Sequence, residues 1–143
     1  MQALAFPSYH YNMQLQEGKE YIFDTVRKKW VRLTPEEWVR QNVVQYLLQV
    51  KKYPAALLAV EKEIHIGELR KRCDIVVYKD AQPWMIIECK EMNVPLSEGV
   101  LMQLVRYNTA FCCTYLIITN GSYTWGWEVE NGAVKELNEM PEW

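Results

Sequence analysis

Two neighbouring stretches of sequence, CDIVVY (73–78) and PWMIIECK (83–90), decide how this chain is expected to fold. Both are short apolar runs separated by a brief polar turn, a pattern typical of two buried β-strands. They nevertheless contain Asp74, Glu88 and Lys90. Burying an isolated charge costs several kcal/mol, so these three groups need a partner, a metal ion or a shifted pKa.

The three charged side chains are expected to meet. Side chains alternate between the faces of a strand, so Glu88 and Lys90 point the same way. If the two strands pair antiparallel across their turn, the start of one lies beside the end of the other, which brings Asp74 close to both. One interpretation is a site for a divalent cation. The other is a buried cluster of salt bridges, which would be a costly way to hold a strand end.

The residue types suit phosphodiester hydrolysis. Mg²⁺ binds oxygen ligands, usually one or two carboxylates with water and substrate phosphate, and Asp74 and Glu88 can supply the carboxylates. Such a cation polarises the phosphate and lowers the pKa of a bound water. Lys90, partly removed from solvent, would orient or deprotonate the attacking water or neutralise charge on the phosphate. The pattern predicts a Mg²⁺ cofactor, with Mn²⁺ as its substitute.

Composition bounds the class of protein. The chain has 143 residues, half of them apolar, which fits a single domain with a sizeable core. Its net charge of −2 is unusual for a nucleic-acid-binding domain but leaves room for a local basic surface. The four cysteines lack zinc or CxxC spacing and are expected to be buried thiols in a reducing compartment. With no signal-peptide pattern and no membrane-length apolar run, we expect a cytoplasmic protein without a membrane partner.

The order of elements predicts an α/β fold. Residues 1–19 show no periodicity and are expected to form an extended arm, and residues 20–143 a single domain. Thr34-Pro35-Glu36-Glu37 is a typical helix start. Helices are expected over 35–50 and 97–111, strands over 57–66, 73–78, 84–90 and 115–119, and hairpins over 21–33 and 123–137. This order predicts a central mixed β-sheet flanked by α-helices, with an N-terminal and a C-terminal β-hairpin.

The arrangement of Asp74 and Glu88-Cys89-Lys90 resembles the D-x(n)-E-x-K core of the PD-(D/E)XK nuclease superfamily. More narrowly, the chain is similar to the N-terminal nuclease domain of type I restriction enzyme R subunits, in its short form. The similar stretches are LTPEEWVRQ (33–41), LLAVEKEI (57–64), RKRCDIVVY (70–78), WMIIECK (84–90), QLVRY (103–107) and ITNG (118–121). The resemblance covers roughly residues 20–125 and implies a restriction-endonuclease-like fold.

The resemblance also implies roles for individual residues. Asp74 and Glu88 match the metal-binding acids, and Lys90 matches the catalytic lysine. An acid on the first helix commonly joins the metal site, and Glu37 is the best match, with Glu36 as the alternative; both acids also suit a helix N-terminus without any further role.

Gln103 and Tyr107 match the Q-x(3)-Y motif of related nucleases. At positions i and i+4 they share one helix face, from which they would position the substrate or Lys90. The alternative is a solvated glutamine beside a packed tyrosine.

A basic cluster, Arg70, Lys71 and Arg72, precedes Asp74. It is a candidate for contacts with backbone phosphates of DNA, and a solvated turn is the alternative. Glu61, on the strand before it, is expected to lie on a solvent face.

The sequence therefore predicts a Mg²⁺-dependent endonuclease domain acting on DNA, in restriction-modification or defence. Its expected partners are DNA and subunits of a restriction-modification complex, and a homodimer is compatible with the sequence although no dimer surface is evident. A non-catalytic binding or interaction module of the same fold, or an RNA-processing nuclease, are the alternatives. No G-x(4)-G-K-[ST] loop occurs, so the chain is not expected to hydrolyse ATP.

Overall fold

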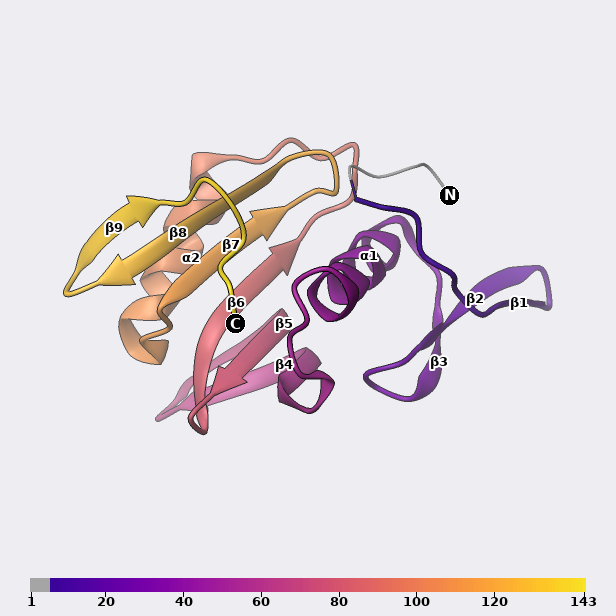
Figure 1. The fold of residues 1–143 in the computed structure, drawn as a ribbon, viewed down its shortest axis with the longest axis horizontal. Coiled ribbons are helices and arrows are strands. Elements are labelled where there is room, and N and C mark those ends of the chain that lie inside the picture. The colour runs from indigo at the N-terminus through magenta and orange to yellow at the C-terminus, as the bar shows by residue number, and fades with distance from the viewer. Residues whose placement is uncertain (1–5) are drawn as a thin grey trace.

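The structure is a computed structural model that describes residues 6–143. It contains a six-stranded sheet, a smaller three-stranded sheet and two α-helices, which confirms the predicted α/β class (Figure 1). The strands of the large sheet are β4 (Leu58–Ile66), β5 (Leu69–Lys79), β6 (Gln82–Cys89), β7 (Tyr115–Thr119), β8 (Thr124–Glu130) and β9 (Ala133–Glu136). They lie side by side in chain order.

The large sheet is mixed because of a single parallel pair. Strands β4, β5 and β6 form the expected antiparallel meander, and β7, β8 and β9 pair antiparallel as well. Only β6 and β7 run parallel. The connection between them contains helix α2 (Glu98–Phe111), which crosses one face of the sheet, as parallel neighbours require a long crossover.

The two helices begin where the sequence predicts. In α1 (Pro35–Gln49) the Thr34 hydroxyl accepts a hydrogen bond from the Glu37 amide at 3.1 Å, and Pro35 occupies the first turn. In α2 the Ser97 hydroxyl caps the amide of Val100. The helix α2 ends at Cys112, whose left-handed backbone stops the helical path.

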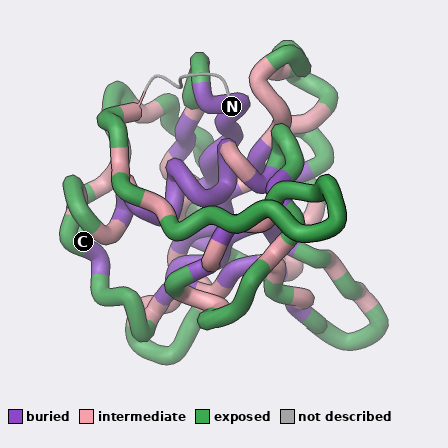
Figure 2. The backbone as a smooth tube through the Cα atoms, turned by 90° about the vertical axis from the view of Figure 1, so that its right-hand side faces the viewer, coloured by how far each residue is buried: buried purple, intermediate pink, exposed green. Residues whose placement is uncertain are grey.

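Each face of the large sheet has its own core. On one face α1 contributes Val39, Val43 and Leu47, which pack against alternate residues of β5 and β6. On the other face α2 contributes Leu104 and Phe111. Figure 2 shows this buried interior behind mostly exposed and intermediate backbone, viewed from the side on which β1–β3 lie. A sheet covered on both faces explains why the strand sequences are nearly continuous apolar runs.

The N-terminal region differs from the expected arm and hairpin. Strand β1 (Met13–Gln16) pairs with β2 (Lys19–Asp24), which pairs with β3 (Lys29–Arg32), so the predicted hairpin is a three-stranded sheet. Part of the predicted arm is thus a paired strand, because the Glu17–Gly18 turn has the positive φ angles that reverse the chain tightly. Residues 1–5 of that arm lie outside the described residues.

Three of the four cysteines are buried thiols, as predicted, and one is exposed. Cys73, Cys89 and Cys113 are buried free thiols, whereas Cys112 is exposed at the end of α2. Within residues 6–143, neither helix is both long and apolar enough to cross a bilayer.

Candidate active site

Asp74 and Glu88 lie next to one another on β5 and β6. Ile75 pairs with Ile87 in the antiparallel register, which places the two acids one position further along. The Asp74 Oδ2 atom accepts a hydrogen bond from the Cys89 amide at 2.8 Å. The predicted meeting of the two strand ends is therefore confirmed.

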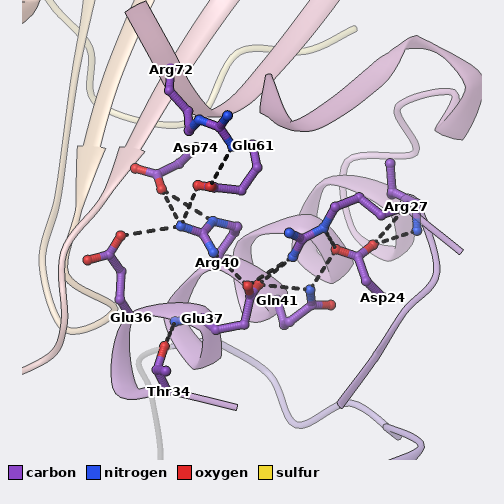
Figure 3. Close-up of polar contacts among 11 residues, drawn as sticks. Asp24, Arg27, Thr34, Glu36, Glu37, Arg40, Gln41, Glu61, Arg72 and Asp74 are labelled. Atoms are coloured by element: carbon purple, nitrogen blue, oxygen red, sulfur yellow. Dashed lines mark hydrogen bonds and ion pairs between the residues drawn. The ribbon is translucent and has the colours of Figure 1, made fainter. Parts of the chain in front are cut away.

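The second oxygen of Asp74 is held by Arg40, a residue of α1 that the sequence did not single out. Arg40 Nη2 lies 2.6 Å and Nε 3.2 Å from Asp74 Oδ1. The same guanidinium contacts Glu37 at 2.7 Å, Glu61 at 2.8 Å and Glu36 at 3.3 Å (Figure 3). Burial lowers the pKa of Arg40, but its hydrogen bonds and charge contacts with these acids outweigh burial and raise the pKa overall.

Glu61 is held in an unusual backbone conformation beside Asp74. Its φ angle is 54°, and β4–β5 pairing resumes on either side of it, at Val60 with Ile75 and Lys62 with Cys73. Backbone strain of this kind costs about 1–3 kcal/mol and is concentrated at functional sites. In this conformation the Glu61 side chain faces Arg40 and is 28% exposed. The prediction that Glu61 lies on a solvent face is wrong.

Glu37 faces away from Asp74. Its carboxylate accepts two hydrogen bonds from Arg27 Nη2, both at 2.9 Å, as well as bonds from Arg40 and Gln41. The Arg27 and Gln41 side chains also bind the fully buried Asp24. The Glu37 side chain is 8% exposed, so its oxygens are occupied inside the protein.

Glu36 is the acid of α1 that is oriented toward the strand acids. Its side chain is 50% exposed and contacts Arg40. Burial and the nearby Asp74 carboxylate raise the pKa of Glu36, while the positive charges of Arg40 and Lys90 oppose the rise. Of the two predicted alternatives, Glu36 is therefore the acid oriented toward Asp74, whereas Glu37 is turned toward Arg27.

A pocket of about 200 Å³ opens on the α2 side of the same strand ends. It is lined by Lys71, Glu88, Lys90, Val100, Gln103 and Leu104. Three residues predicted from separate parts of the sequence, Glu88, Lys90 and Gln103, therefore share one cavity. Among the described residues, the Lys90 ammonium makes no hydrogen bond or ion pair, so it remains available to a ligand.

Lys71 supplies the positive charge nearest to Glu88. Its Nζ atom lies 3.0 Å from Glu88 Oε1 and 5.0 Å from the centre of the Tyr107 ring. Tyr107 in turn stacks on Phe111. Tyr107 therefore contacts Lys71, not the pocket itself, and a cation over an aromatic face is stabilised by the ring quadrupole.

Glu88 has a single cationic partner. Its buried Oε1 atom lies 3.0 Å from the Lys71 ammonium. Burial and the adjacent Asp74 carboxylate raise the pKa of Glu88 to about 7, while Lys71 opposes the rise. A carboxyl in this state gains from any additional positive charge brought to it.

The predicted basic cluster of Arg70, Lys71 and Arg72 lies on β5, and its side chains point to different faces of the sheet. Lys71 is largely buried beside Glu88, whereas Arg72 is exposed and lies 3.5 Å from Glu61. Arg70 is exposed opposite His65 on β4. The three residues do not form one basic surface, because side chains of a strand alternate in direction.

The donors present fit a hard cation only in part. Within the described residues, no three Asp, Glu, His or Cys side chains form a ready metal-binding group. Two carboxylates, Asp74 and Glu88, do converge at neighbouring strand positions, and Mg²⁺ requires only one or two carboxylates with water and phosphate. Arg40 and Lys71 supply the positive charge at these acids. The site therefore fits a cation held by Asp74 and Glu88, with Glu36 nearby.

Sequence reasoning missed Arg40 as a component of this site. Its spacing of three and four residues from Glu37 and Glu36 signals ion pairs on a helix. Its contact with Asp74 joins residues 34 positions apart and requires the packing of α1 on β5.

Residues 35–141 match the family described as the type I restriction enzyme R protein N terminus. The matched segment begins with α1 and includes every strand of the large sheet. The chain belongs to this family. The resemblance inferred from the D-x(n)-E-x-K pattern is thereby confirmed for most of the chain. No curated protein matches the sequence.

Proposed function

We propose that this R-protein N-terminal domain is a metal-dependent endonuclease that hydrolyses DNA phosphodiester bonds. Membership of the family implies a role in a restriction system. The observation that supports catalysis is the shared position of Glu88, Lys90 and Gln103 around one pocket, beside Asp74.

Asp74 and Glu88 would hold the Mg²⁺ ion, or Mn²⁺ in its place. When bound, the ion would polarise the scissile phosphate and lower the pKa of an attacking water. Glu36 would approach from the helix side, where its half-exposed carboxylate contacts Arg40. Arg40 would orient Asp74, because its guanidinium binds Oδ1 while Oδ2 accepts a hydrogen bond from the Cys89 amide.

Lys90 would act on the water or on the developing phosphate charge. It lines the pocket together with Glu88, and its ammonium is unpaired within the described chain. An ammonium in a partly desolvated pocket stabilises negative charge more strongly than one in bulk water. Gln103, exposed on α2, would bind the substrate at the pocket rim, and Tyr107 would position Lys71. DNA and other subunits of a restriction complex would be the partners.

A plasmid-nicking assay tests the proposal. Wild-type protein with Mg²⁺ or Mn²⁺ is expected to nick supercoiled DNA, and Lys90→Met is expected to reduce the rate by about 10²–10⁴-fold, the usual contribution of a positioned proton-transfer group. Lys62→Met is a matched control, because Lys62 is exposed on β4. Equal rates for the wild type and Lys90→Met, with unchanged unfolding curves, would refute the assigned role of Lys90.

A non-catalytic module is the second candidate, and one observation favours it. Both strand acids already have cationic partners, Arg40 for Asp74 and Lys71 for Glu88. If the cluster were only structural, the wild type would neither nick DNA or RNA nor release heat on titration with Mn²⁺. Nicking of RNA but not DNA would instead support an RNA-processing nuclease with the same residues.

A further inference from the structure

The outer face of the three-stranded sheet has an unusual combination of residues. Ile22, Asp24 and Leu33 point inward and are buried, so the alternate residues of the strands point outward. The outward residues include three aromatic side chains and two cations: Tyr21, Phe23, Trp30, Lys19 and Arg32.

The strand register gathers these side chains on one surface, which we call the aromatic face. Tyr21 lies directly opposite Arg32, and Phe23 directly opposite Trp30. The Phe23 and Trp30 ring centres are 5.4 Å apart, and Trp30 is 43% exposed. Neither of the two cores includes Tyr21, Phe23 or Trp30 among its members or packed neighbours. Packing of the two cores within residues 6–143 therefore does not explain why aromatic residues occupy these positions.

Charge identifies the kind of ligand that suits this face. Its remaining outward positions, Gln14 and Gln16, are neutral, and the acids of these strands, Glu20 and Asp24, point to the other side. The chain as a whole carries a net charge of −2, so a face with two cations and no acid is a local exception. Aromatic residues and arginine are also enriched at protein–protein interfaces, but lysine is depleted there. Aromatic rings interleaved with cations are typical of surfaces that bind single-stranded nucleic acid.

We propose that the aromatic face binds single-stranded nucleic acid. Bases would stack on Trp30, Phe23 and Tyr21, and Lys19 and Arg32 would contact the phosphates. Stacking suits any base, because every base has a π-face, and the site is therefore expected to tolerate many sequences. The proposal goes beyond phosphodiester hydrolysis and requires no metal ion. Strands β1–β3 lie outside residues 35–141, the segment that matches the family.

The sheet that carries this face is fixed to the candidate active site. Asp24 at the end of β2 binds Arg27, Arg27 binds Glu37, and Arg40 joins Glu37 to Asp74 (Figure 3). These contacts are short and largely buried. A nucleic-acid strand bound on the aromatic face would therefore keep a constant position relative to Asp74.

Fluorescence anisotropy with a labelled oligothymidylate, in EDTA, tests this proposal without catalysis. The wild type is expected to bind the single strand more tightly than a duplex of equal length. Trp30→Ala is expected to weaken binding by about five- to one-hundred-fold, the range that base stacking supplies, and Trp30→Phe to restore most of it. Arg32→Gln is expected to lower the slope of log K against log[salt] by about 0.7, the value for one phosphate contact on a single strand.

Tyr123→Ala is the matched control, because Tyr123 is 70% exposed away from this face. It is expected to leave affinity unchanged. Wild-type affinity in both Trp30→Ala and Arg32→Gln, or no binding of the oligothymidylate at all, would overturn the proposal. A change in self-association with Trp30→Ala, without an effect on oligonucleotide binding, would assign the face to protein contact instead. If the wild type binds the oligonucleotide but does not nick plasmid DNA, only the endonuclease proposal is refuted.

Discussion

Two groups of buried charges lie on either side of the β5 and β6 strand ends, and they differ in how completely they are satisfied. On the α1 side, Arg27 and Arg40 pair with Asp24 and Glu37 in a closed network. On the α2 side, Glu88 pairs with a single cation, Lys71, beside a pocket.

This difference separates carboxylates that several donors bind from a carboxyl group that has a single cationic partner. A carboxylate surrounded by donors has no capacity left for a ligand, so Glu37 is interpreted as part of the framework. A buried carboxyl whose pKa is raised to about 7 is destabilised in its charged form and responds to added positive charge. Asp74 belongs to both groups, since it binds Arg40 and adjoins Glu88.

The largest expected effect comes from opening the closed network. Arg40 pairs with the buried carboxylates of both Asp74 and Glu37, and Arg40→Met removes this shared cation. Removal of one partner from such a network lowers the free energy of unfolding by about 3–5 kcal/mol. Urea unfolding monitored by circular dichroism measures the loss. Arg106→Met, at an exposed position on α2, is expected to change stability by less than about 0.5 kcal/mol. Equal stability of Arg40→Met and wild type would remove the distinction between the two groups.

Low pH is expected to reduce the stability of the protein by protonating Asp24, a member of the closed network. Burial raises the pKa of Asp24, but hydrogen bonds from Arg27 and Gln41 and the charge of Arg27 outweigh burial and lower the pKa overall. A group whose pKa is lower in the folded state contributes its full stability above its unfolded pKa of about 3.9 and loses it as pH falls through the folded pKa.

Urea unfolding between about pH 5 and pH 2.5 tests this dependence. Wild-type stability is expected to fall more steeply over this range than that of Asp24→Asn, which cannot titrate. Parallel pH profiles for the two proteins would show that Asp24 is not held in its ionised form.

A smaller effect, on Mn²⁺ affinity, is expected when Lys71 is removed from its ion pair with Glu88. Lys71→Met frees Glu88 Oε1 from its ion pair, so Mn²⁺ no longer competes with the ammonium. The Mn²⁺ affinity is expected to rise about tenfold, equivalent to roughly 1.4 kcal/mol, as measured by titration calorimetry. Lys135→Met, at an exposed position on β9, is the control. A lower Mn²⁺ affinity in Lys71→Met would show that Lys71 supports the site rather than competes for it.

The smallest effect separates the two adjacent acids of α1. Glu36→Gln is expected to weaken Mn²⁺ binding by about two- to fivefold without altering the unfolding curve, since its side chain is half exposed. Glu37→Gln should show the reverse pattern, with lower stability and nearly unchanged Mn²⁺ affinity, because its oxygens bind Arg27 and Arg40. The opposite assignment of the two effects would restore Glu37 as the helix acid of the metal site.

Local sequence patterns predicted most of the elements. The Thr34 and Ser97 caps mark both helix starts, and the apolar runs mark β5 and β6, because capping and burial depend on near neighbours. The meeting of Asp74 and Glu88 followed from one short turn and an antiparallel register. Strand β1 (Met13–Gln16) was not predicted, since its alternation of apolar and polar residues spans only four positions and none of them is buried.

The mixed sheet, its two helices and the approach of Asp74 to Glu88 could be predicted, because they depend on short-range periodicity and strand pairing. The number of partners that each buried charge has could not be predicted, because it depends on how whole elements pack. The rotation of α1 against β5 turned Glu37 toward Arg27 and brought Arg40 to Asp74, and α2 brought Gln103 to the pocket. These contacts join residues distant in the chain, and their geometry depends on how whole elements pack, which no local pattern encodes.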